Sequence, residues 1–183
     1  MRTVGLVLLL GWIVFWIYWL IAATDAKPGQ GRGVGYWGVR IVVIAVNYVF
    51  LRFVLSRHAA HVQPWLIGIG LALWVAGLGL AVWARLYIGR NWGTPMSKKE
   101  EGEAELVTTG PYHSIRHPIY TGIITAMIGT SLATTVYGLI AVAVLGGFFI
   151  FSALTEERNM GATFPDTYPA YKASTKMLFP FIF

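Results

Sequence analysis

The chain has 183 residues, of which 56% are hydrophobic and only 12% are charged, with a formal net charge of +6. Soluble domains carry about 25% charged residues, so this composition excludes a disordered chain, a nucleic-acid-binding tail and an ordinary soluble domain. The absence of cysteine excludes a disulfide scaffold, a thiolate metal site and a cysteine nucleophile. Uncharged runs of about 18 residues or more are typical of membrane-spanning helices. Such runs cover Thr3–Thr24, Val62–Ala84 and Ile119–Thr155, which indicates an integral membrane protein.

The first predicted span covers residues 3–23. Small residues at Ala22 and Ala23 would also suit the cleavage site of a signal peptide. The apolar run is longer than the roughly 7–15 residues of a signal h-region, and it contains several tryptophans. We therefore interpret it as a retained helix.

The second and third predicted spans cover residues 36–55 and 64–88. Arg40 and Arg52 lie near the ends of the second span, where their side chains can reach the headgroups, while Asn47 needs a partner inside the bundle. Pro64 opens the third span, because proline is tolerated in the first helical turn.

The run Ile119–Thr155 is too long for one span. As a single helix it would measure about 55 Å, against a hydrocarbon core of about 30 Å. A break within Gly129–Gly138 would divide it into a hairpin of two short helices, the fourth and fifth spans. The fold class is therefore an all-α polytopic bundle of about five transmembrane helices.

Five spans place the two termini on opposite sides of the membrane. All lysines and arginines except Arg2, Arg52 and Arg57 then fall on the side of the C-terminus. The excess of basic residues marks the cytoplasmic side, so the N-terminus is expected outside and the C-terminus in the cytoplasm.

Two polar clusters flank the predicted hairpin. Arg116 and His117 lie at the entrance of its first helix, just before Pro118, where free backbone N–H groups attract anions. Glu156 and Glu157 lie where the second helix leaves the membrane. A tight hairpin brings the clusters together as a pocket with one polar and one apolar wall. Taken alone, these residues would also suit an ordinary membrane boundary without a site.

The order and spacing of several motifs resemble the isoprenylcysteine carboxyl methyltransferase family and the related phospholipid methyltransferases. The motifs are Leu106-Val-Thr-Thr-Gly-Pro-Tyr112, Arg116-His-Pro-x-Tyr-x-Gly122, Glu156-Glu157 and Phe164-Pro-Asp-Thr-Tyr168-Pro-Ala-Tyr171-Lys172. The resemblance covers residues 83–183. It implies that residues 1–63 form two N-terminal transmembrane helices and that residues 64–183 form the catalytic core. Ser174 stands where the family often has an arginine, with Lys176 two residues further on.

The resemblance implies an S-adenosylmethionine-dependent methyltransferase with a cytoplasmic active site. Arg116 and Glu157 would lie nearest the reacting centre as catalytic residues. The implied cofactor-binding residues are Glu105, Leu106, Val107, Tyr112, His117, Pro118, Ile119, Tyr120, Glu156 and Glu157. No metal and no nucleic acid are expected.

The expected acceptor is a lipophilic small molecule or prenylated substrate that enters from the bilayer, among membrane lipids. Carboxyl O-methylation of an isoprenylcysteine-like compound needs no general base, because a carboxylate is already ionised at neutral pH. N-methylation of a phospholipid amine or another small lipophile would need one, and His117 or a glutamate is the candidate. A membrane reductase and a non-enzymatic scaffold are further alternatives. The sequence leaves the oligomeric state open.

Overall fold

The computed structural model describes residues 2–24, 62–92 and 105–180. Over these residues the regular secondary structure is helical, and β pairing is limited to an isolated parallel β-bridge between Ile115 and Lys176. The predicted all-α class is confirmed. The second predicted span, with Asn47, lies outside the described residues.

Three of the described helices are long and apolar enough to cross a membrane. Helix α1 covers Arg2–Thr24, α3 covers Pro64–Ile88 and α5 covers Gly138–Thr163. Pro64 occupies the first turn of α3 as predicted, and Gly89 closes that helix with a φ of 53°, a left-handed conformation that glycine adopts without strain. All three helices carry large apolar side chains that are exposed on the outer surface of the bundle, as expected for contact with lipid.

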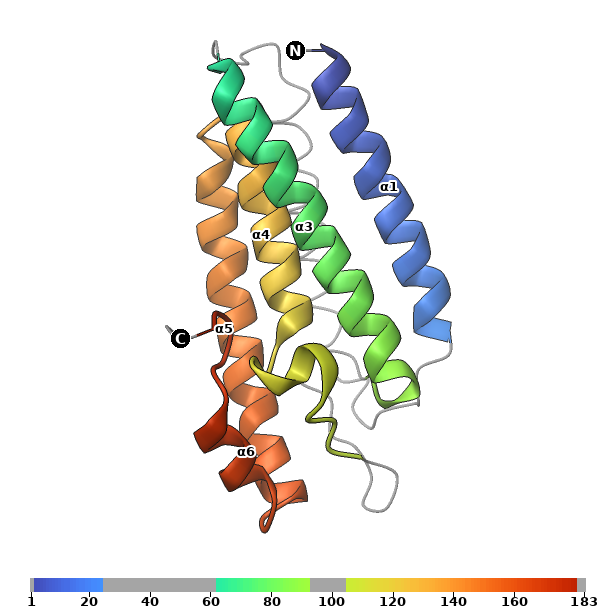
Figure 1. Ribbon diagram of the computed structural model, residues 1–183, viewed down its shortest axis with the longest axis vertical. Coiled ribbons are helices and arrows are strands. Elements are labelled where there is room, and N and C mark those ends of the chain that lie inside the picture. Colours follow the sequence, from blue (N-terminus) through green and yellow to red (C-terminus); the bar gives the residue numbers. More distant parts are fainter. Residues whose placement is uncertain (1, 25–61, 93–104, 181–183) are drawn as a thin grey trace, which may run out of the picture.

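Helix α4, Pro118–Thr134, is the inner helix of the bundle and is buried on most sides. Seventeen residues give it a length of about 26 Å, shorter than α1, α3 and α5. The turn to α5 falls at residues 135–137, inside the predicted break. In Figure 1 the two helices run back beside each other from this turn, which lies at the same end of the bundle as the start of α1.

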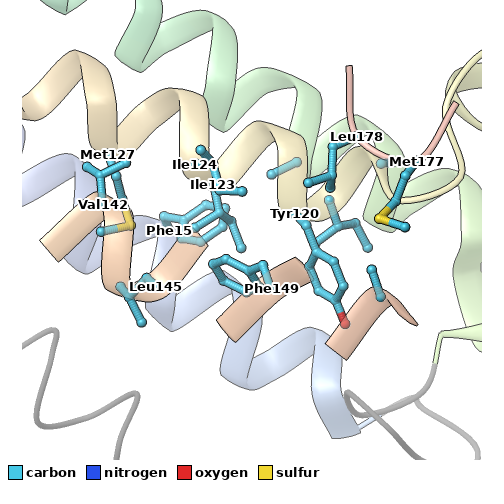
Figure 2. Packing of buried hydrophobic residues seen from close by; sticks show 14 of the residues in the cluster. Phe15, Tyr120, Ile123, Ile124, Met127, Val142, Leu145, Phe149, Met177 and Leu178 are labelled. Carbon is cyan, nitrogen blue, oxygen red and sulfur yellow. The ribbon is translucent and has the colours of Figure 1, made fainter. Parts of the chain in front are cut away.

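The apolar core joins helices α1, α3, α4 and α5 with the end of the chain. Figure 2 shows Phe15 of α1 facing Ile123 of α4 and Phe149 of α5. Met177 and Leu178, from the apolar C-terminal run, pack into the same cluster beside Tyr120. The tail therefore belongs to the fold, and it lies against the end of the bundle that carries the polar residues.

Two short 3-10 turns and a short helix cover this polar end. The turns are η1, Gly89–Asn91, which follows α3, and η2, Gly110–His113, which precedes α4. Helix α6, Tyr168–Ser174, follows α5 and packs against it. These elements surround the residues that the sequence motifs singled out.

Candidate functional site

The entrance of α4 is held in place by the C-terminal tail. His117 is the residue before the helix and has a non-helical backbone (φ −124°, ψ 59°), which a following proline favours. The backbone N–H of Arg116 donates to the carbonyl of Lys176 at 2.8 Å, and that of His117 donates to Met177 at 3.1 Å. Residues far apart in the sequence thus fix where Arg116 and His117 lie.

The hairpin brings the two predicted polar clusters into contact. Arg116 Nε lies 2.6 Å from Glu157 Oε1, and Lys172 Nζ of α6 lies 2.8 Å from Glu157 Oε2. The ring nitrogens of His117 lie 3.5 Å from Glu156 Oε2 and 3.6 Å from Glu157 Oε1. A carboxylate pair therefore meets an arginine, a lysine and a histidine at one end of the apolar bundle.

The two neighbouring glutamates have different surroundings. The side chain of Glu157 is 2% exposed and makes the ion pairs with Arg116 and Lys172. The side chain of Glu156 is 26% exposed and accepts a hydrogen bond from the Tyr120 hydroxyl. Glu157 thus connects secondary-structure elements, whereas Glu156 is partly exposed.

Tyr120 separates the polar end from the apolar core. Its ring is nearly parallel to that of His117, with centroids 5.4 Å apart, and it stacks on Phe149 at 4.9 Å. In Figure 2 the Tyr120 ring lies beside Phe149. Aromatic stacking on both sides fixes the ring and so directs its hydroxyl to Glu156.

A cavity of about 150 Å³ opens beside these side chains and is open to the outside. The wall combines carboxylates, aromatic rings and aliphatic side chains. It consists of Ile88, Asn91, Trp92, Glu105, Leu106, Val107, Tyr112, Arg116, His117, Ile119, Tyr120, Glu156, Asn159, Met160, Thr163, Tyr168 and Tyr171.

Most of the predicted site residues lie on this wall. They are Glu105, Leu106, Val107, Tyr112, Arg116, His117, Ile119, Tyr120 and Glu156. The other two predicted residues, Pro118 and Glu157, are buried behind it. The structure thus brings the predicted set together, while the catalytic and cofactor-binding roles of its members stay predictions.

Sequence reasoning missed the wall residues that follow Glu156 along α5. The helix continues for two turns beyond the glutamates, so Asn159, Met160 and Thr163 lie on the same face as Glu156. Their spacing of three, four and seven residues is the signal that would have identified them. Ile88 at the end of α3, Asn91 and Trp92 just after it, and the two tyrosines of α6 also went unassigned.

Burial keeps the tyrosines around the cavity neutral. It raises the pKa of Tyr171 to about 12 and raises the pKa values of Tyr112 and Tyr168 well above the ordinary value of 10.0. The neutral hydroxyls act as donors within the wall, since that of Tyr171 donates to the carbonyl of Tyr112 at 2.7 Å. The rings therefore offer rigid, poorly hydrated surfaces to a ligand.

The charge of His117 predicts how stability depends on pH. Burial alone would lower the pKa of His117, but hydrogen bonding and charge attraction from Glu156 and Glu157 outweigh it and raise the pKa above 6.5. Protonated His117 thus stabilises the folded state fully below about pH 6.5, and this contribution is lost as the pH rises through the raised pKa. We expect the unfolding midpoint of the parent protein in detergent to fall over this range more than that of His117→Gln. Parallel curves for the two proteins would contradict the assignment.

Residues 65–167 match the model of the phospholipid methyltransferase family. The chain belongs to this family, which confirms the resemblance seen in the sequence motifs.

Two individual proteins are also similar to the chain. The cobalt-zinc-cadmium resistance protein CzcN of Cupriavidus metallidurans is 28% identical over 151 residues, which cover 80% of this chain and 63% of that protein. The solved structure of the eukaryotic intramembrane Ras methyltransferase ICMT (isoprenylcysteine carboxyl methyltransferase) aligns with a TM-score of 0.59 at 24% identity, covering 84% of this chain and 55% of that one. The chain therefore has an ICMT-like membrane fold, and it spans a little over half the length of each of these proteins.

Proposed function

We propose that this protein is a membrane methyltransferase that moves a methyl group from S-adenosylmethionine to a lipophilic acceptor. The observation that carries the proposal is the cavity at the mouth of the α4–α5 hairpin. It joins carboxylates and aromatic rings at the polar end of an apolar bundle, in a chain of the phospholipid methyltransferase family. A charged methyl donor and a lipophilic acceptor would meet at such a boundary.

The chemistry of the wall suits the cofactor. Its ammonium and ribose hydroxyls need acceptors, which the carboxylates of Glu105 and Glu156 supply. Its sulfonium is a cation that aromatic faces attract, and Tyr112 and Tyr120 lie on the wall. We expect the predicted set to hold it, with Leu106, Val107 and Ile119 contributing apolar contact. Pro118 and Glu157, which are buried behind the wall, would contribute indirectly by fixing the position of the first turn of α4.

S-adenosylmethionine bound there would supply the methyl group. The lone pair of the acceptor would form the new bond to the methyl carbon, while the carbon–sulfur bond would break and leave its electron pair on sulfur. The protein has to align the two molecules and keep the site dry. Alignment lowers the barrier of such a displacement by converting a bimolecular encounter into a reaction between positioned groups. The stacked ring of Tyr120 and the buried tyrosines of α6 and η2 provide rigid walls for this purpose.

The resemblance to isoprenylcysteine carboxyl methyltransferases makes a carboxylate the first candidate acceptor. Opposite charges on the carboxylate and the sulfonium neutralise in the transition state, which a poorly hydrated site favours. No proton has to leave. The expected enzyme is then an isoprenylcysteine O-methyltransferase-like protein whose substrate enters from the bilayer.

The charges on the wall favour the alternative, an amine acceptor such as a phospholipid headgroup. Arg116 lines the cavity, but its Nε binds Glu157 and its Nη1 donates to the carbonyl of Thr175 at 2.6 Å, which leaves it a weaker partner for a substrate carboxylate. Glu105 and Glu156 give their part of the wall a negative charge. Glu156, hydrogen-bonded to Tyr120 and 3.5 Å from His117, could accept the proton that an amine must lose.

The stability of the transferred methyl group distinguishes the two acceptors. Purified protein is incubated with methyl-labelled S-adenosylmethionine and either prenylcysteine analogues or a lipid extract, and the products are treated with base. Methyl esters release their label, whereas N-methyl groups keep it. We expect labelled product in at least one mixture at a rate at least tenfold above a Glu156→Gln control. Equal background labelling in all mixtures would contradict the proposed function.

A further inference from the structure

A buried arginine joins the end of α1 to the turn after α3. Arg85 is 4% exposed and lies in the last turn of α3. Its Nη1 donates to the carbonyl of Gly89 at 2.8 Å, and its Nη2 donates to the carbonyl of Ala22 near the end of α1. One guanidinium thus binds carbonyls from two separate helix ends, which a planar fork of donors can do and a lysine ammonium does less well.

The same guanidinium supports a residue of the cavity wall. The Cζ atom of Arg85 lies 4.8 Å from the centre of the Trp92 ring, and Trp92 lines the cavity. Trp19 of α1 packs edge-on against this ring, with centroids 5.9 Å apart. Cation–π attraction strengthens when the cation is removed from water, as it is here. Trp92 is therefore held by both Arg85 and α1.

The position of this turn affects more of the wall than one ring. Ile88 and Asn91, on either side of Gly89, also line the cavity. The Asn91 side chain donates to Glu105 Oε2 at 3.1 Å, which connects the turn to the opposite segment of the wall. A shift of the turn would displace these residues together with Trp92.

We propose that Arg85 is a positioning residue that fixes Trp92 and thereby couples the end of α1 to the affinity of the cavity for its cofactor. Helix α1 lies outside residues 65–167, the part that matches the family model. It nevertheless supports the site through Trp19 and the Ala22 carbonyl. The inference rests on the proposed function, because it names S-adenosylmethionine as the ligand whose affinity changes.

A double-mutant cycle on full-length protein tests the coupling. The affinity for S-adenosylmethionine is measured by calorimetry for the parent, Arg85→Lys, Trp19→Leu, Trp92→Ala and the two double variants that contain Trp92→Ala. We expect Arg85→Lys to weaken binding about tenfold and Trp19→Leu about threefold, in line with a desolvated cation–π contact and an edge-on ring contact. In the Trp92→Ala background both losses of affinity should be clearly smaller than in the parent background.

Trp83→Leu is the matched control, because Trp83 is a neighbouring tryptophan of α3 that is 53% exposed on the outer surface. It should bind as the parent does. Two results would overturn this inference without touching the proposed function. One is that the losses of affinity are as large in the Trp92→Ala background as in the parent, and the other is that both single variants bind as tightly as the parent. No binding by the parent would overturn the proposed function as well. If Arg85→Lys does not fold, the effect of Trp19→Leu on the affinity for S-adenosylmethionine, measured with and without Trp92→Ala, tests the inference by the same criterion.

Discussion

Replacing Glu157 by glutamine is expected to destabilise the protein strongly, although Glu157 does not line the cavity. The substitution keeps the shape of the side chain but leaves Arg116, whose side chain is 8% exposed, without its counter-charge. Removing one partner of a buried ion pair costs about 3–5 kcal/mol, which for a chain of this size lowers the unfolding midpoint on the order of 10 °C. The exposed pair with Lys172 adds little.

The adjacent Glu156→Gln is the matched control for this prediction. Glu156 lies on the wall and accepts a hydrogen bond from Tyr120, so its replacement should leave the unfolding midpoint within a few degrees of the parent. It should weaken cofactor binding about 10–100-fold, the usual value of a hydrogen bond to a charged group. Thermal unfolding in detergent and ligand titration measure the two effects separately. Equal losses of stability in both variants would contradict the prediction that Glu157 stabilises the fold while Glu156 binds the cofactor.

Replacing Gly77 by alanine is expected to separate α3 from α4. A Cβ at position 77 would lie 2.5 Å from the backbone nitrogen of Ala126 and 2.5 Å from the carbonyl oxygen of Gly122, both in α4. Backbone atoms cannot move aside as a flexible side chain can, so the helices must shift apart. Overpacking of this kind costs about 1–3 kcal/mol and more when the backbone is the obstacle.

Gly79→Ala is the control for the helix contact. It lies two residues further along α3, and a Cβ there would meet nothing within 4 Å. Because alanine favours a helix over glycine by about 1 kcal/mol, this variant should be as stable as the parent or slightly more stable. The yield of monodisperse protein and the unfolding midpoint should fall for Gly77→Ala only. A Gly77→Ala protein as stable as Gly79→Ala would contradict the close packing.

The positions of the helices followed from the sequence because each depends on local signals. Uncharged runs indicated α1, α3 and the hairpin, and Pro118 marked the start of α4 because a proline fits the first turn. The order and spacing of the sequence motifs likewise predicted the site residues between Glu105 and Tyr120. The predicted N-outside orientation and the count of five spans stay predictions, since the second span lies outside the described residues.

The parts of the site that sequence reasoning missed depend on contacts between distant residues. Nothing local in the sequence shows that Lys172 reaches Glu157, or that the chain near Lys176 pairs with the segment before α4. The support of Trp92 by Arg85 and Trp19 is of the same kind. In these contacts Glu157 lies behind the cavity wall, and its place nearest the reacting centre stays a prediction.

Titration of the purified protein with S-adenosylmethionine tests the central claim most directly. The parent protein should bind the cofactor saturably at one site, S-adenosylhomocysteine should compete for it, and a nicotinamide dinucleotide should not. Glu156→Gln, folded as shown by its unfolding midpoint, should bind about 10–100-fold more weakly. No saturable binding by the parent, or unchanged affinity in Glu156→Gln, would contradict a cofactor site at the mouth of the α4–α5 hairpin.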